Sequence, residues 1–162
     1  MNYWITTHWP PFLQDKPTLS SPDPQYHYRV YLPDGREEAG QEMMKGDYVF
    51  IYESKTGRPL RNGRNYAYGR QGVIALVRTT SPIQEKSDEE PEEYADGSII
   101  CWKWQAETQE QEIGFCSRVN VCRALGYREG YTFHGFGDKH SGLKKLSKKQ
   151  YEALLACFRA SH

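Results

Sequence analysis

The sequence predicts a single α+β domain over residues 1–162, a small, partly closed β-barrel of about six strands with short helices and a C-terminal helix. A length of 162 residues fits one domain and is sufficient for a sizeable core. Two apolar runs rich in β-branched and aromatic residues, 48–53 and 72–79, are typical of buried strands. Near the C-terminus the apolar residues instead recur with the period of a helix.

The central strand is predicted over residues 48–53, directly after a turn at Gly46 and Asp47. Glycine accommodates the positive φ of such a turn, and an aspartate side chain can hydrogen-bond its own backbone there. The strand is followed by Ser54, and residues 55–70 then carry five basic side chains and no acidic one. A buried strand whose polar end reaches a cationic loop suits a pocket beside a polyanion.

The N-terminal strand is predicted over residues 2–7, an aromatic and β-branched run that requires the terminus to be tied into a sheet. Pro10 and Pro11 end it, because proline lacks a backbone N–H and pushes the preceding residue away from helical geometry. Trp9 is thereby held on a stiff extended segment just beyond the strand. A loop rich in Pro and Ser follows, and then a short strand at 27–32 that a Pro-Asp-Gly turn closes.

A helical segment and a hairpin are predicted on either side of the two apolar strands. Residues 37–44 are expected to form one or two helical turns. The stretches 98–105 and 112–116 are expected to pair as the arms of a hairpin. Alternation with period two places Trp102 and Trp104 on one face of the first arm.

The last third of the chain is predicted to hold two helices and a strand. The first helix covers residues 119–125 and is stopped by Gly126. Residues 131–136 are strand-like. Ser147 caps the final helix, which is expected to pack on the sheet. Its apolar face consists of Tyr151, Leu154, Leu155 and Phe158.

Residues 82–97, called here the acidic segment, hold seven acids and one base, which leaves 20 bases and 14 acids in the rest of the chain. Carboxylates at that density repel one another and stay hydrated. The segment is therefore expected to remain outside the core as a flexible insertion. A second hypothesis is that it lies over the cationic loop as a nucleic-acid mimic and regulates binding in cis.

The sequence predicts neither a metal site nor a cofactor, and no catalytic constellation. The four cysteines include no C-x-x-C pair, and the five histidines do not supply zinc spacing. His134, His140 and Ser141 lack the partners that an active site requires, so an enzyme is not expected. Reduced thiols, with no signal peptide and no membrane-length apolar run, indicate a cytoplasmic protein with no membrane partner.

Several short motifs occur in a familiar order along nearly the whole chain. They are Tyr3-Trp4-Ile5, Gly46-Asp47 followed by residues 49–54, the glycine-led strand at 72–75, Gly135-Phe136-Gly137, and residues 140–155. This order resembles the EVE domain, a member of the PUA-like superfamily that also contains the YTH readers of methylated adenine. The last two motifs are similar to EVE domains fused to HNH nucleases in modification-dependent restriction.

The resemblance implies a small PUA-like β-barrel that captures a modified nucleobase, flipped out of DNA or presented by RNA, in an aromatic pocket. No HNH motif is present in the sequence. The chain is therefore expected to be either a stand-alone reader or the amino-terminal part, or the partner, of a nuclease.

A pocket that reads a base needs flat apolar walls for stacking and polar groups for the base edge. The wall candidates are aromatic residues at strand ends, namely Trp9, Tyr31, Tyr52, Trp102 and Trp104. The edge-reading candidates are Thr7, His8 and Ser54. Glu53 ranks lower, because strand alternation points it away from Tyr52 and Ser54. Residues two apart in a strand are about 7 Å apart, so Trp102 and Trp104 cannot both hold one base.

Phosphate contacts are expected from the basic side chains Lys55, Arg58, Arg61, Arg64, Arg70, Arg118, Arg123, Lys139, Lys144 and Lys145. The leading hypothesis is a non-catalytic reader of methylated or hydroxymethylated cytosine, or of methylated adenine, in DNA. The alternative is a module that binds RNA or a protein partner, with the acidic segment as an interaction tail.

Overall fold

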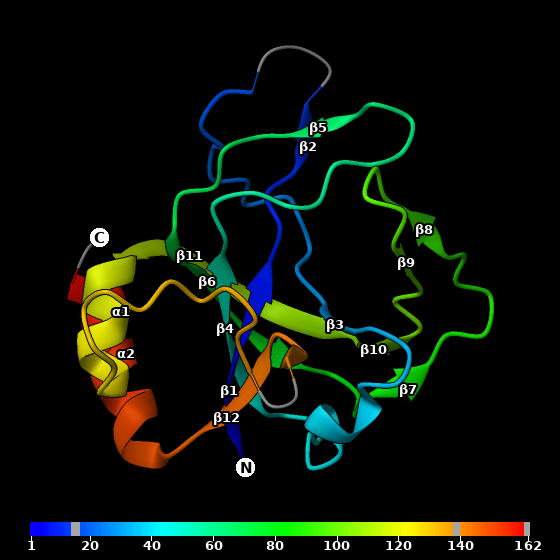
Figure 1. Cartoon of the computed structure of the whole chain (residues 1–162). Helices are drawn as coiled ribbons and strands as arrows, with labels where there is room; N and C mark the ends of the chain where they lie inside the picture. The colour runs from blue at the N-terminus through cyan, green and yellow to red at the C-terminus, as the bar shows by residue number, and fades with distance from the viewer. Residues whose placement is uncertain (14–16, 138–139, 161–162) are drawn as a thin grey trace.

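A five-stranded sheet forms the centre of the fold (Figure 1). The structure is a computed structural model that describes residues 1–13, 17–137 and 140–160. The strand order is β11-β6-β4-β1-β12, with β1 parallel to β4 and all other neighbours antiparallel. These strands are β1 (Tyr3–His8), β4 (Tyr48–Glu53), β6 (Gly72–Thr79), β11 (Thr108–Ser117) and β12 (Leu143–Leu146).

Three smaller sheets complete the strand framework. The three-stranded sheet consists of β3 (Val30–Leu32), β10 (Trp104–Ala106) and β7 (Gln84–Glu85). The two-stranded sheets pair β2 (Phe12–Leu13) with β5 (Asn65–Tyr66), and β8 (Glu92–Glu93) with β9 (Ile99–Ile100). Among the described residues the strand ladders do not close into a barrel, and the fold is α+β with mostly strands and two α-helices.

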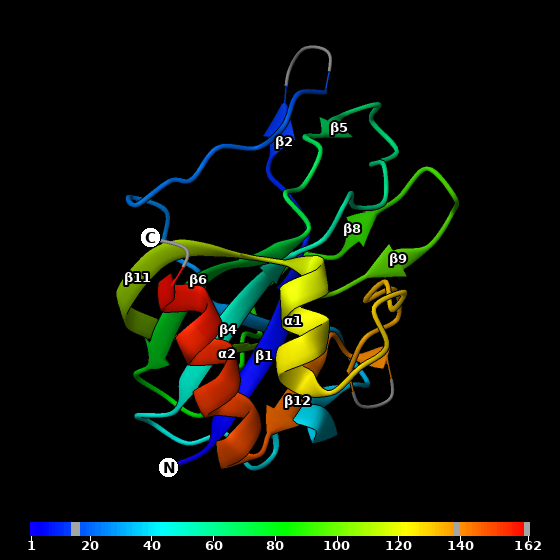
Figure 2. The same cartoon turned by 90° about the vertical axis from the view of Figure 1, so that its left-hand side faces the viewer.

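Both faces of the central sheet are buried. The side chains of β4 show this, because successive side chains of a strand point to opposite faces of the sheet. Phe50 and Tyr52 point to the face covered by α1 (Arg118–Leu125) and α2 (Lys148–Ala160). Figure 2 shows these two helices lying across the sheet. Val49 and Ile51 point to the opposite face, where they meet apolar residues of the three-stranded sheet. This double coverage explains why the strand is apolar almost throughout.

The ends of α1 follow standard capping chemistry. Ser117 accepts a hydrogen bond from the backbone N–H of Asn120 at 3.4 Å. Gly126 ends the helix in the left-handed conformation with φ 79°, which confirms the predicted stop.

The start and the apolar face of α2 are also as predicted. The side chains of Ser147 and Gln150 accept hydrogen bonds from each other's backbone N–H groups at 3.1 and 3.0 Å, which makes a capping box. Leu154 and Phe158 are fully buried against the sheet. Within the described chain, neither α1 nor α2 combines the length and the apolar character needed to cross a bilayer.

Asp47 ties the N-terminus to the central strand. Its carboxylate is fully buried and accepts hydrogen bonds from Trp4 Nε1 and from the backbone N–H groups of Asn2 and Met44, each at 2.9 Å. Gly46 precedes it with φ 92° and provides the predicted turn. The predicted helical turns after the first short strand reduce to a 3-10 helix at Glu37–Gly40.

The predicted hairpin between residues 98–105 and 112–116 is wrong. β10 pairs instead with β3 and β7, while β11 pairs with β6. The ten residues of β11 are long enough to cover the eight-residue β6, and this pairing buries Cys116 in the helix-side core.

The strand predicted at residues 131–136 is also absent from the described structure. Phe133 and Gly135 have φ values of 56° and 64°, which interrupt an extended chain. The aromatic rings of Tyr131, Phe133 and Phe136 pack against the helix-side core, so their apolar character reflects burial without a ladder.

The acidic segment joins the fold, and the prediction that it stays out of the core is wrong at Tyr94. That ring is 1% exposed, and Tyr94 forms an antiparallel bridge with Leu60 of the cationic loop. Arg61 Nη1 lies 2.9 Å from Glu93 Oε2, and the N–H of Ala95 donates to the carbonyl of Pro59 at 2.8 Å. The carboxylates flank the buried aromatic ring, so the segment is anchored and keeps most of its charge at the surface.

Candidate functional site

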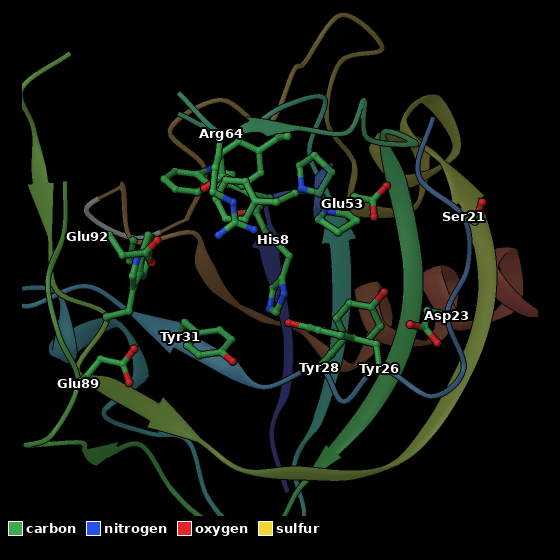
Figure 3. Close-up of a pocket in the computed structure, with 18 residues that line it drawn as sticks. His8, Ser21, Asp23, Tyr26, Tyr28, Tyr31, Glu53, Arg64, Glu89 and Glu92 are labelled. Atoms are coloured by element: carbon green, nitrogen blue, oxygen red, sulfur yellow. The ribbon is translucent and has the colours of Figure 1, made fainter. Parts of the chain in front are cut away.

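A pocket of about 600 Å³ opens at the carboxyl ends of β1 and β4 (Figure 3). Its aromatic walls are Trp9, Phe12, Tyr26, Tyr28, Tyr31, Tyr66 and Trp102. Its ionisable lining residues other than tyrosine are His8, Asp23, Glu53, Arg64, Glu89 and Glu92. The site is thus a mostly aromatic hollow with a few polar groups, as ligand pockets generally are.

The parallel pairing of β1 with β4 places His8 beside Glu53. Each is the last residue of its strand. Alternation puts His8 on the face of Trp4 and Glu53 on the face of Ile51, and both belong to the side opposite the helices. Because parallel strands end at the same edge of a sheet, the polar residues that terminate them converge in one pocket.

Glu53 is a buried carboxylate whose partners all come from the protein. It is 3% exposed, and Arg70 Nε and Nη2 lie 3.3 and 3.4 Å from its two oxygens. The backbone N–H of Arg70 donates at 2.8 Å, and the hydroxyl of Ser20 also donates to the carboxylate. A buried charge requires such compensation. The Glu53–Arg70 pair therefore adds little net charge to the pocket.

His8 is a neutral hydrogen-bond acceptor with no partner at Nε2. Burial lowers its pKa to about 4, against the smaller effects of a hydrogen bond at the Arg29 backbone and the charge of Glu53. A backbone hydrogen bond that raises the pKa is one that the ring donates. Because Nε2 is buried without a partner, the proton lies on the other nitrogen and Nε2 presents a lone pair. The rings of Tyr28 and Tyr31 flank it, each 5.7 Å away between centroids (Figure 3).

Trp9 stands in an aromatic cluster. The ring centroids of Tyr66, Tyr94 and Trp102 lie 5.7, 5.5 and 5.5 Å from it, all edge-to-face. Trp102 Nε1 donates to the hydroxyl of Tyr94 at 3.2 Å, which fixes the indole. A Cβ at Gly57 would lie only 2.9 Å from the Trp9 ring. Trp9 therefore packs against the protein and lines the pocket at the same time.

Carboxylates line two sides of the pocket. Glu89 and Glu92 come from the acidic segment, and Asp23 lies on the other side (Figure 3). Among the described residues neither Glu89 nor Glu92 forms an ion pair. Burial and the neighbouring Glu89 raise the pKa of Glu92. Gln105 donates to Glu89 at 3.1 Å.

The structure brings five of the eight predicted base-pocket residues together. They are Thr7, His8, Trp9, Tyr31 and Trp102. Four of them come from strand ends or from the residues next to them, which is where the sequence directed attention. Of the two neighbouring tryptophans, Trp102 lines the pocket and Trp104 does not.

Tyr52, Ser54 and Trp104 do not line the pocket. Tyr52 points to the helix side, is 1% exposed and stacks on Phe133 at 4.3 Å between centroids. Ser54 donates to the backbone carbonyl of His8 at 3.2 Å and so supports the pocket from behind. Trp104 packs on the core beneath the three-stranded sheet.

Several lining residues were not predicted from the sequence or were ranked low. They are Pro10, Pro11, Phe12, Ser21, Asp23, Tyr26, Tyr28, Glu53, Tyr66, Glu89, Glu92 and Ser141. Alternation correctly separated Glu53 from Tyr52, yet the pocket lies on the side of Glu53. The available signal was that both predicted strands end in polar residues, which parallel pairing would bring side by side. Tyr26 and Tyr28 lie in an irregular stretch before β3, where no periodic pattern of apolar residues could indicate them.

The predicted phosphate-binding residues fall on separate elements. Arg70 is committed to Glu53, and Arg118 donates to the backbone carbonyls of Glu129 and Tyr131 at 2.6 and 2.8 Å. Arg123 pairs with Glu129 at 2.7 Å on α1. Lys144 and Lys145 are on β12, and Lys139 lies outside the described residues. The five of them that the structure describes do not line the pocket.

The four remaining cations belong to the loop between β4 and β5. Arg64 lines the pocket, with its guanidinium 4.5 Å from the centre of the Phe12 ring. Arg61 pairs with Glu93, and Arg58 donates to Ser98 at 3.0 Å. Lys55 is exposed. Of these four loop cations Arg64 lines the pocket, and Arg61 joins the loop to the acidic segment.

Comparison with family models gives no match for this chain, and neither does comparison with curated proteins. Neither comparison therefore identifies an EVE domain. Within the described residues, no group of three or more His, Cys, Asp or Glu side chains is placed to hold a metal ion.

Proposed function

We propose that the protein is a non-catalytic reader that captures a modified nucleobase, flipped out of DNA, in the pocket at the ends of β1 and β4. The observation that carries this proposal is the combination of aromatic walls with the buried, unpartnered Nε2 of His8. A flipped base is held by stacking on its faces and by hydrogen bonds to its edge. The exocyclic amine of cytosine or adenine is the matching donor for Nε2.

The dimensions of the pocket support a base together with its modification. A volume of about 600 Å³ lies inside the range of sites that enclose small ligands. Tyr31, Trp102 and Trp9 contribute aromatic rings from three different segments, so a planar ligand meets walls on several sides. Stacking of one base on an aromatic side chain contributes about 1–3 kcal/mol.

The loop cations support a nucleic-acid partner. Among the described residues, Lys55, Arg58 and Arg64 form no ion pair with an acid. They belong to the same loop, and Arg64 reaches the pocket itself. Phosphate contacts there would fix the strand while the pocket reads the base.

The finer fold assignment, a PUA-like domain of the EVE type, is part of the same proposal. Its support is the order of the sequence motifs and a central sheet whose one face is covered by both described α-helices. A nuclease domain or subunit is the partner that such a reader would direct to modified DNA.

The test is a binding series with duplexes of one sequence that carry 5-methylcytosine, 5-hydroxymethylcytosine, N6-methyladenine or no modification. The proposal predicts at least about tenfold tighter binding of one modified duplex, equivalent to about 1.4 kcal/mol. The corresponding RNA strands separate a DNA reader from an RNA reader. Equal affinity for all duplexes and RNAs contradicts the proposal.

A further inference from the structure

The charge of the pocket is unusual for a site that approaches phosphates. Asp23, Glu89 and Glu92 contribute three carboxylates, whereas Arg64 is the one cation among the described lining residues. Glu53 is already balanced by Arg70 and does not alter this difference. Carboxylates repel the backbone of a nucleic acid, so a reader of neutral bases gains nothing from three of them.

Glu89 and Glu92 are close enough to affect each other. Burial, and to a smaller extent the charge of Glu89, raises the pKa of Glu92, and no cation of the described chain forms an ion pair with either residue. The fold nevertheless holds the segment in place, because the Tyr94 ring is buried and its hydroxyl accepts from Trp102. A bound cation would relieve the repulsion between the two carboxylates.

The remaining pocket groups also favour a cation that donates hydrogen bonds. The faces of tryptophan and tyrosine rings attract cations through the ring quadrupole, and Tyr31 and Trp102 lie with Glu89 and Glu92 in the lining. His8 Nε2 offers a lone pair and no proton. Aromatic faces, carboxylates that form no ion pair among the described residues, and a bare acceptor together match a planar, positively charged ring that carries N–H groups.

We propose, on the basis of the base-reading function above, that the pocket selects a cationic N-alkylated base, with 1-methyladenine and 3-methylcytosine as its simplest forms. In both bases the methyl group lies on a ring nitrogen of the pairing edge, and the ring carries a positive charge with an exocyclic amine attached. Such bases cannot form a normal pair, which lowers the cost of flipping them out of a duplex. The acidic segment is then the specificity element of the site.

The experiment compares isomers that differ in charge and not in the number of methyl groups. Fluorescence anisotropy is measured on single-stranded oligonucleotides with one 1-methyladenine or one N6-methyladenine, and with 3-methylcytosine or 5-methylcytosine. Single strands remove the pairing difference between the isomers. The cationic isomer of each pair is expected to bind about tenfold more tightly, the scale of a desolvated cation–aromatic contact.

Variants of the acidic segment identify the source of the preference. Glu92→Gln and Glu89→Gln are each expected to reduce the preference for the cationic isomer over the neutral isomer at least about threefold. Glu90→Gln is the matched control, because Glu90 is exposed and does not line the pocket. An unaltered preference in both pocket variants overturns the assignment to the acidic segment.

The outcomes separate this inference from the proposed function. Equal binding of the two isomers, both tighter than the unmodified strand, overturns the charge preference and leaves the reader function standing. Equal binding of modified and unmodified strands overturns the reader function itself. Capture of a trimethyl-lysine peptide without oligonucleotide binding overturns both, and shows that the pocket binds a protein partner.

Discussion

His8 and Glu53 are register partners at the ends of two parallel strands. The protein supplies hydrogen-bond donors to the Glu53 carboxylate and no partner to His8 Nε2. The Glu53 carboxylate accepts from Arg70 and Ser20, whereas His8 Nε2 is buried without a partner. A buried polar atom without a hydrogen bond costs about 1–3 kcal/mol. Among the described lining residues, His8 Nε2 is therefore the atom for which we propose a hydrogen-bond donor from a ligand.

The stability of the protein should fall in mild acid because of His8. Its pKa is about 4 in the folded state, against 6.5 for an unperturbed histidine side chain, so between these values the unfolded chain binds more protons. The free energy of unfolding therefore rises with pH across this window and levels off above it. A shift of this size corresponds to roughly 3 kcal/mol as an upper value.

The measurement is urea unfolding at a series of pH values for the parent and for His8→Phe. The difference between the two proteins should change with pH between about 4 and 6.5 and be constant at higher pH. Identical pH profiles would show that His8 titrates normally and contradict its burial as a neutral ring.

Removal of the Arg70 guanidinium should destabilise the fold. Arg70→Met leaves the Glu53 carboxylate buried without its cationic partner, and loss of one partner costs about 3–5 kcal/mol in comparable buried pairs. The double variant Glu53→Gln with Arg70→Met should recover a large part of this loss. Chemical denaturation of the parent and both variants checks the expectation, and a single variant as stable as the parent would rule out the buried pair.

Trp9 should be important for folding as well as for binding. Three aromatic rings surround it edge-to-face, so Trp9→Ala leaves a cavity and should lower the free energy of unfolding by about 3–5 kcal/mol. Trp9→Phe keeps one ring and should be the milder variant. Thermal unfolding distinguishes the two variants. A melting temperature of Trp9→Ala close to that of the parent would show that Trp9 lines the pocket without stabilising the fold.

Lys55 and Arg58 should contribute affinity without specificity. Lys55→Gln or Arg58→Gln is expected to weaken modified and unmodified duplexes equally and to reduce the slope of log K against log salt by about one. Arg123→Gln is the control, because Arg123 lies on α1 and pairs with Glu129. A loss confined to the modified duplex would place these two cations in base recognition instead.

The strand framework was predictable where one residue pattern decided the structure. Residues 72–79 are β6, as the apolar and β-branched character of residues 73–77 indicated, and Gly126 ends α1 as predicted. The predicted hairpin was wrong because the periodicity of apolar residues indicates that a segment is a strand and does not indicate which strand it pairs with. In β10 and β11 the partners are set by sheets that form over long sequence separations.

The pocket was predictable in part for similar reasons. His8 and Trp9 were found from a strand end followed by prolines, and Tyr31 and Trp102 from aromatic residues in predicted strands. Glu89 and Glu92 were assigned to solvent because their charge density is high, and nothing local showed that Tyr94 would anchor them beside Trp102. Glu89 and Glu92 reach the pocket through contacts between residues far apart in the sequence, and a local sequence pattern does not predict such contacts.

The most direct test of a flipped base in this pocket uses 2-aminopurine as a reporter beside the modified base of the duplex that binds most tightly. Its fluorescence increases when its stacked neighbour leaves the helix. Addition of the parent protein should raise the fluorescence of the modified duplex and not of the unmodified one, and His8→Phe should abolish most of the increase while still binding DNA. Tight binding of the modified duplex with no change in fluorescence, or an equal increase for the unmodified duplex, would contradict capture of a modified base between the ends of β1 and β4.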